Sequence, residues 1–150
     1  MRAYEFTESS TLLDQLLAAE SGNWTMLEAS GMAQFNKSDM FDDTVKNRMQ
    51  MLPAIQEKIK EFMDTKSRDP MQPYGGKDKP FGGNGPIGQA FPKMRYAHLN
   101  YDLSLFYTME GRNPTVFKLY GVFSHDDIGI GQPMNIKRQK NFISKLKREF

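Results

Sequence analysis

The sequence predicts an α+β domain in which two helices pack on one face of a small antiparallel sheet, with an arm before them and a basic helix after the sheet. Apolar residues recur at helical spacing along Val45–Phe62, which predicts the two helices. Met94–Phe123 contains three short segments with the alternating or continuous apolar patterns of strands. A length of 150 residues suits one domain with a modest core. We therefore predict an N-terminal extension with a short helix at 1–37 and the main domain at 38–150.

The N-terminal half contains a predicted short helix, an ambiguous segment and a longer helical region. Ser9–Thr11 can cap a helix that runs to about residue 20. Trp24–Phe35 is ambiguous, because a glycine would interrupt a strand there. Ser38–Asp39 opens the longer region, and Pro53 breaks or kinks it because proline lacks an N–H and clashes with the preceding turn. The apolar face of this region is predicted to be core and consists of Val45, Met49, Leu52, Ile55, Ile59 and Phe62.

The segment 68–92 is rich in glycine and proline and is predicted to be a loop without regular structure. It contains six glycines and five prolines. A loop of this length in a small domain is either functional or disordered. Lys77 and Lys79, with the aromatic residues Tyr74 and Phe81, resemble the mixture of cations and rings that binds single-stranded nucleic acid. A plain linker explains the segment equally well, and its glycines do not form a phosphate-binding motif.

Both histidines of the chain lie at predicted strand ends beside carboxylates. His98 lies four residues before Asp102 at the turn between the first two strands, and His125 follows the third strand and precedes Asp126 and Asp127. Histidine exchanges protons near neutral pH, so a proton-transfer site is the first hypothesis. Three alternatives stay open: a turn hydrogen bond between His98 and Asp102, a cap role for His125, and a divalent metal site built from both histidines and a carboxylate.

The charge of the chain is distributed unevenly. Residues 1–65 carry 6 Lys and Arg against 11 Asp and Glu, whereas residues 66–150 carry 14 against 7. The basic half therefore has a net charge of +7 and also holds both histidines. It ends in a predicted helix at about 135–150 with many lysines and arginines. This separation indicates a polyanionic partner, and an unevenly charged surface without a partner is the simpler alternative.

Several classes of protein are excluded by composition. The chain has no cysteine, which excludes a disulfide scaffold, a thiol nucleophile and a cysteine-type zinc finger. The first residues carry too many acids and too short an apolar run for a signal peptide. No segment has the length of a transmembrane helix. We expect a cytoplasmic protein with no membrane partner.

Two short motifs carry a resemblance to a known family. They are HLNYD at residues 98–102 and YGVFSHDDIG at residues 120–129. With the order of helices, glycine-rich loop and three strands, they make residues 39–131 resemble the RelE/ParE superfamily of bacterial toxins, most closely the YafQ-type mRNA endonucleases. The resemblance implies a RelE-like fold and metal-independent mRNA cleavage without a cofactor. It also implies the ribosome and an antitoxin protein as partners.

The resemblance implies an mRNA interferase reaction in which the ribose 2′-hydroxyl attacks the adjacent phosphate. The reaction leaves a 2′,3′-cyclic phosphate and a free 5′-hydroxyl, and it needs a base, an acid and cations. His98 or Asp102 would be the base and His125 the acid, although the two histidines are interchangeable at this stage. The remaining RNA-binding and charge-stabilising roles would fall to Arg95, Lys77, Lys79, Tyr96, Phe123, Lys137 and Arg138.

Two functions other than RNA cleavage also remain open. A non-catalytic protein of the same fold would bind nucleic acid or a protein target. A structural component of a phage particle is the third class, which the N-terminal arm and 11 methionines suggest. Loss of activity on replacing both histidines distinguishes the enzyme from the first alternative.

Overall fold

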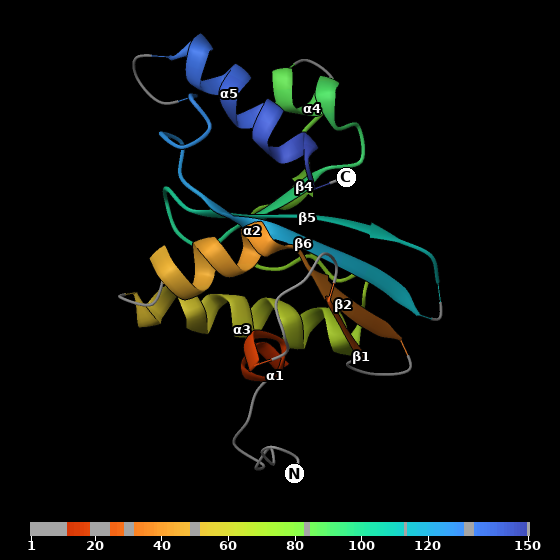
Figure 1. Cartoon of the computed structure of the whole chain (residues 1–150). Coiled ribbons are helices and arrows are strands. Elements are labelled where there is room, and N and C mark those ends of the chain that lie inside the picture. The colour runs from red at the N-terminus through yellow and green to blue at the C-terminus, as the bar shows by residue number, and fades with distance from the viewer. Residues whose placement is uncertain are drawn as a thin grey trace.

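A six-stranded mixed sheet organises the chain, with the strands in the order β1-β2-β6-β5-β4-β3. The computed structural model describes residues 12–18, 25–28, 32–48, 52–82, 85–112, 114–130 and 134–149. The strands are β1 (Thr25–Glu28), β2 (Ala33–Lys37), β3 (Asp78–Pro80), β4 (Arg95–His98), β5 (Ser104–Glu110) and β6 (Thr115–Phe123). Figure 1 shows helices on both sides of this sheet.

The position of β2 contradicts two predictions, those of a purely antiparallel sheet and of a domain boundary at residue 37. β2 lies inside the sheet and runs parallel to β6. It pairs with β6 from Ala33 opposite Thr115 to Lys37 opposite Leu119, while β1 pairs antiparallel with its other edge. The side chain of Phe35 is fully buried. The sheet is therefore not purely antiparallel, and the boundary predicted at residue 37 cuts off an integral strand. Two parallel strands are joined by a long connection, so the sequence around β2 does not show that its partner is β6.

The first face of the sheet is covered by α1 (Leu12–Ala18) and α3 (Pro53–Arg68), as Figure 1 shows. Their buried side chains include Leu13, Leu16 and Phe62, which join the larger apolar cluster. The predicted break is confirmed, because Pro53 occupies the first turn of α3, where its missing N–H costs nothing. The cap predicted at Ser9–Thr11 lies outside the described residues.

The helical region before α3 is short and irregular. It consists of α2 (Asp39–Asp42) followed by a π-helical turn, η1 (Asp43–Arg48). The Ser38 hydroxyl caps α2 by accepting a hydrogen bond from the N–H of Phe41 at 3.2 Å, as the sequence predicted. The same hydroxyl donates to the carbonyl oxygen of Tyr120 in β6, which ties α2 to the sheet. Met49 of the predicted apolar face lies outside the described residues.

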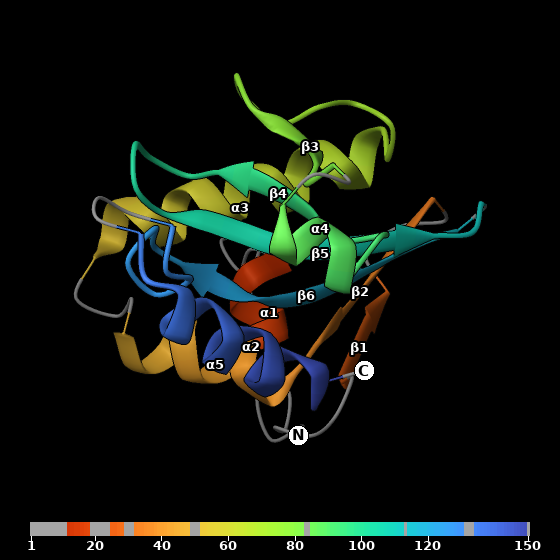
Figure 2. The same ribbon diagram turned by 90° about the horizontal axis from the view of Figure 1, so that it is seen from above.

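The opposite face of the sheet carries α4 (Pro86–Ala90) and α5 (Ile136–Lys147), and Figure 2 shows them from above. α5 confirms the predicted C-terminal helix. The prediction that 68–92 has no regular structure is wrong, because β3 and α4 lie within it. β3 pairs with β4 at the sheet edge and ends at Pro80, where a proline is tolerated. A Cβ at Gly88 of α4 would lie 1.6 Å from the carbonyl oxygen of Gly82, so the close approach requires glycine.

The three strands predicted along Met94–Phe123 are confirmed as the consecutive antiparallel strands β4, β5 and β6. An irregularity between Phe106 and Tyr107 of β5 shifts their register against β6. Gly121 lies there with φ +152°, and an added Cβ would meet the ring of Phe123 at 2.8 Å and the Thr44 hydroxyl at 3.0 Å. The absence of a side chain at Gly121 therefore leaves room for the Phe123 ring and the Thr44 hydroxyl. None of the described helices is long and apolar enough to cross a bilayer.

Candidate active site

A cavity of about 280 Å³ lies at one end of the sheet, and both histidines and Asp102 line it. Its lining comes from the residues on either side of β3, from β4, β5 and the turn between them, and from the end of β6 and the segment that follows. The residues are Lys77, Phe81, Tyr96, His98, Asp102, Ser104, Phe106, Phe123, Ser124, His125, Ile128 and Ile130. We call this space the catalytic cavity, a name that refers to the function proposed for it below.

The strand register decides which side chains face the catalytic cavity. His98 pairs with Ser104 of β5, and Ser104 pairs with Phe123 of β6, so the three lie in one row across the sheet. Lys77 extends this row, since its carbonyl oxygen accepts the N–H of His98 at 2.9 Å. Tyr96, two residues before His98, faces the same side. One face of the sheet thus brings a cation, an imidazole and an aromatic ring together.

Asp102 is paired with His125 and not with His98. Its Oδ1 accepts the backbone N–H of His125 at 3.1 Å and lies 3.2 Å from the Nδ1 of the same histidine. This geometry favours a proton on Nδ1 and directs Nε2 away from the carboxylate. Both side chains remain accessible, with 44% of His125 and 41% of Asp102 exposed. The predicted turn hydrogen bond between His98 and Asp102 is therefore replaced by a pair 23 residues apart.

Two polar turns hold this pair, and sequence reasoning missed the residues that build them. Asn100 Oδ1 accepts the N–H groups of Asp102 at 2.8 Å and of Leu103 at 2.6 Å. Ser124 and Asp127 cap each other: the Asp127 carboxylate accepts the Ser124 N–H at 2.9 Å, and the Ser124 hydroxyl accepts the Asp127 N–H at 3.0 Å. The Ser-x-x-Asp spacing is that of a capping motif, and it could have predicted this turn from the sequence. The turn between them presents His125.

His98 is partly buried beside an aromatic ring and positive charges. Its ring centroid lies 5.4 Å from that of Tyr96. Burial lowers the pKa of His98, and the charges of Lys77, His125 and Lys79 lower it further. His98 is therefore neutral at pH 7 and has a free lone pair to accept a proton. The structure distinguishes the two histidines: one is neutral beside cations, and the other has a carboxylate partner.

Arg95 lies on the opposite face of the sheet from His98. Its Nε donates to the hydroxyl of Tyr107 at 3.1 Å, and its guanidinium lies 3.8 Å from the buried Asp78. Residues three apart on a strand face opposite sides, which explains the placement. The prediction that Arg95 joins His98 in a catalytic site is wrong. The cation that lines the cavity is Lys77.

The other predicted RNA-binding residues divide between the catalytic cavity and the rest of the surface. Tyr96 and Phe123 line the cavity. Lys79 lies opposite Tyr96 in the strand register and is exposed on the same face. Lys137 and Arg138 are exposed on α5 outside the cavity, and Arg138 pairs with Asp126 at 2.8 Å. Across the parts of the chain that the structure describes, no three His, Cys, Asp or Glu side chains form a group that could hold a metal ion.

Comparison with known proteins gives one similarity. No protein-family model matches the sequence, and no curated protein matches it at a significant level. Among solved structures, the chain is similar to the crystal structure of the E. coli DinJ-YafQ toxin-antitoxin complex, with 20% sequence identity and a TM-score of 0.47. The match covers 61% of this chain and 91% of that chain. A similarity of this size does not carry a function across, so the function has to be argued from the residues of the cavity.

Proposed function

We propose that this protein is an endoribonuclease that cleaves single-stranded mRNA by attack of a ribose 2′-hydroxyl on the adjacent phosphate. The supporting observation is the placement of His98, the Asp102–His125 pair and Lys77 in one cavity. These groups supply a proton acceptor, a proton donor with a counter-charge, and a cation. Those are the groups that transesterification of a phosphodiester needs.

The two histidines take different parts in the proposed reaction. Neutral His98 removes the proton from the ribose 2′-hydroxyl, and the 2′-oxygen forms a bond to phosphorus. The bond from phosphorus to the 5′-oxygen breaks, and protonated His125 gives its Nε2 proton to that oxygen. The products are a 2′,3′-cyclic phosphate and a 5′-hydroxyl, so His98 ends protonated and His125 neutral. The ammonium of Lys77 stabilises the additional negative charge on the pentacoordinate phosphorus.

The walls of the catalytic cavity suit an unpaired nucleobase. Phe81 and Tyr96 lie with their ring centroids 4.7 Å apart, beside His98. Single-stranded RNA is recognised by stacking of bases on such rings, whereas a base inside a duplex is not accessible to them. We therefore expect single-stranded RNA to be cleaved in preference to double-stranded RNA.

The proposed activity is tested by the termini of the cleaved RNA. Incubation of purified protein with single-stranded RNA should give fragments with 2′,3′-cyclic phosphate and 5′-hydroxyl ends, and excess EDTA should not reduce the rate. The double variant His98→Ala/His125→Ala should lose both this activity and any growth inhibition on expression. Retained cleavage in the double variant would overturn the assignment. RNA binding without cleavage by the wild type would favour the non-catalytic alternative.

The pH dependence of cleavage gives a separate prediction for His98. Because its pKa is lowered from the ordinary value of 6.5, the acidic limb of kcat/KM should have its midpoint below pH 6.5. Lys77→Ala removes a positive charge that lowers this pKa, so the limb should move to higher pH. Lys93→Ala, an exposed lysine outside the catalytic cavity, serves as the control. If the midpoint of the acidic limb of kcat/KM is the same in Lys77→Ala as in the wild type, the role of His98 as base is contradicted.

The cellular partners in this proposal are those that the resemblance to RelE/ParE toxins implies. They are mRNA, the ribosome, and an antitoxin that neutralises the activity. Cleavage of a reporter mRNA with and without purified ribosomes tests the second of these. Relief of growth inhibition by the product of an adjacent reading frame tests the third.

A further inference from the structure

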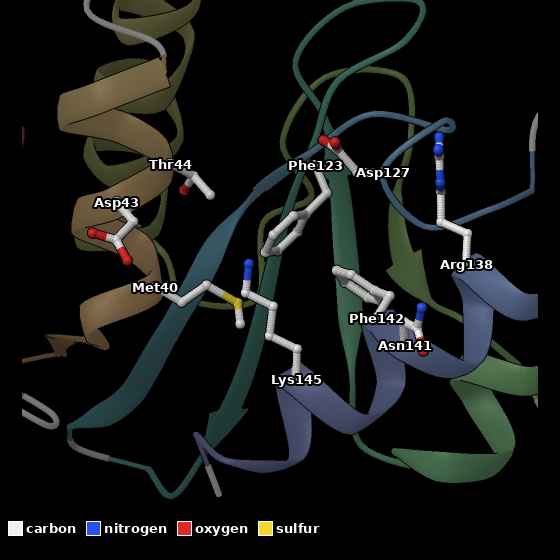
Figure 3. Close-up of a pocket in the computed structure, with 9 residues that line it drawn as sticks. All are labelled: Met40, Asp43, Thr44, Phe123, Asp127, Arg138, Asn141, Phe142 and Lys145. Carbon is white, nitrogen blue, oxygen red and sulfur yellow. The ribbon is translucent and has the colours of Figure 1, made fainter.

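A second cavity, of about 320 Å³, lies between α5 and the segment formed by α2 and η1. Figure 3 shows its lining residues, which are Met40, Asp43, Thr44, Phe123, Asp127, Arg138, Asn141, Phe142 and Lys145. The volume is at the lower end of the range for small-ligand sites, roughly 300–1,000 Å³. None of the functions argued above uses this space, which we call the α5 cavity.

The α5 cavity adjoins the catalytic cavity through the ring of Phe123, which lines both. The ring lies in a row of aromatic side chains that continues from one cavity to the other. Its centroid is 5.0 Å from that of Phe106 in the catalytic cavity and 4.9 Å from that of Phe142 in the α5 cavity. The two cavities therefore lie next to each other, with the ring of Phe123 between them.

One face of α5 supplies polar groups to the rim of the α5 cavity. Arg138, Asn141 and Lys145 are three and four residues apart, so they project from the same side of the helix. All three are exposed. Figure 3 shows the amino group of Lys145 directed toward Phe123. Lys145 makes no ion pair with any of the residues that the structure describes.

The opposite rim of the α5 cavity offers hydrogen-bond acceptors. Asp43 from η1 and Asp127 from the turn after β6 contribute carboxylates. The floor between the two rims is apolar and consists of Met40, Phe123 and Phe142. A nucleotide has a flat apolar ring, amino donors at the ring edge and a phosphate, and each of these has a counterpart here.

We propose that the α5 cavity binds a nucleotide of the RNA strand just beyond the two that flank the scissile phosphate. In this subsite the base or ribose lies over Phe123 and Phe142, and the phosphate contacts the ammonium of Lys145, with Arg138 beside it. The carboxylates of Asp43 and Asp127 accept hydrogen bonds from the edge of the base. This inference rests on the proposed endoribonuclease function and extends its substrate from a single phosphodiester to a strand.

Substrates of two lengths test the subsite by kinetics. Lys145→Ala should raise KM for an oligonucleotide of roughly eight residues about three- to tenfold with little change in kcat. For a dinucleotide, which reaches only the catalytic cavity, the variant should match the wild type. Lys140→Ala changes another exposed lysine of α5 that lines neither cavity, and it should leave both substrates unaffected. An equal rise in KM for both substrates, or no rise for either, would overturn the proposed subsite.

A binding measurement separates failure of the subsite from failure of the proposed function. A 2′-O-methyl oligonucleotide cannot be cleaved, so its affinity is measured by fluorescence anisotropy whether or not the protein is an enzyme. Lys145→Ala should weaken this affinity and reduce the slope of log affinity against log salt by about 0.7, the value for one phosphate contact on a single strand. Unchanged affinity and slope would overturn the inference even if cleavage is confirmed. Binding of a free mononucleotide as tight as that of the oligonucleotide would overturn the strand subsite in favour of a small-molecule site.

Discussion

Asp102→Asn is expected to lower kcat for RNA cleavage by roughly 100-fold, with a much smaller change in KM. The substitution keeps an oxygen that can accept from the Nδ1 and the backbone N–H of His125, which lie 3.2 and 3.1 Å from Oδ1. It removes the negative charge that balances protonated His125. The amide in its place no longer fixes the proton of His125 on Nδ1, so the ring is held less firmly in the orientation that presents Nε2 to the leaving oxygen, while the surface that binds RNA is unchanged. Single-turnover rates at saturating RNA measure the effect.

A matched carboxylate on the same surface provides the control for Asp102. Asp126 follows His125 directly, has a side chain that is 87% exposed, and pairs with Arg138 outside the catalytic cavity. Asp126→Asn should leave kcat unchanged. A wild-type rate in Asp102→Asn, or an equal loss in both variants, would show that the Asp102–His125 pair has no special part in the reaction.

The second large effect is expected on stability, from a buried ion pair on the other face of the sheet. Lys66 of α3 and Asp78 of β3 lie 2.7 Å apart, with 2% and 0% of their side chains exposed. Burial lowers the pKa of Lys66, while the adjacent Asp78 favours its charged form. Asp78→Asn leaves the ammonium buried without its counter-charge, which should reduce the free energy of unfolding by about 3–5 kcal/mol. Urea unfolding followed by circular dichroism measures the loss.

Asp78 also fixes the position of its two neighbours, Lys77 and Lys79. Its carboxylate accepts hydrogen bonds from the N–H of Tyr74 at 2.9 Å and from the hydroxyl of Tyr107. Because neighbouring residues of a strand face opposite sides, anchoring Asp78 on the α3 side directs both lysines to the side of the catalytic cavity. Loss of this anchor in Asp78→Asn should therefore affect RNA cleavage as well as stability.

Two further variants make the stability prediction specific. Lys66→Met/Asp78→Asn should be more stable than Asp78→Asn alone, because the unpaired buried ammonium is gone. Glu57→Ala breaks the exposed pair with Lys60 on the same helix, at 3.4 Å, and should change stability by less than about 1 kcal/mol. A double variant no more stable than Asp78→Asn would mean that the cost does not come from the buried charge.

Much of the fold was predictable because its signals are local. The helical spacing of Ile55, Ile59 and Phe62, the break at Pro53 and the alternation in β4 and β5 each depend on a few neighbouring residues. β2 was not predictable in the same way, because its central position depends on pairing with β6, about 80 residues further along the chain. β3 was hidden among glycines and prolines, since three residues at a sheet edge leave almost no pattern.

Three members of the candidate site were predictable, whereas the pairing between them was not. His98, Asp102 and His125 were singled out because histidines beside carboxylates at strand ends are uncommon, and all three line one cavity. The spacing of four residues favoured a contact between His98 and Asp102, whereas the structure pairs Asp102 with His125. Arg95 could have been excluded from the sequence, because it lies three residues from His98 on the same strand and so faces the other side.

The sequence by itself determined the α+β class, the three consecutive strands and the choice of His98, Asp102 and His125 as a candidate site. Those properties follow from side-chain chemistry and from periodicities that a short segment carries alone. Only the tertiary structure decided that Asp102 pairs with His125, that Lys77 lines the cavity, and that Phe123 lines two cavities. Contacts between residues distant in sequence depend on strand register and on how helices cover the sheet, and neither is encoded in the spacing of neighbours.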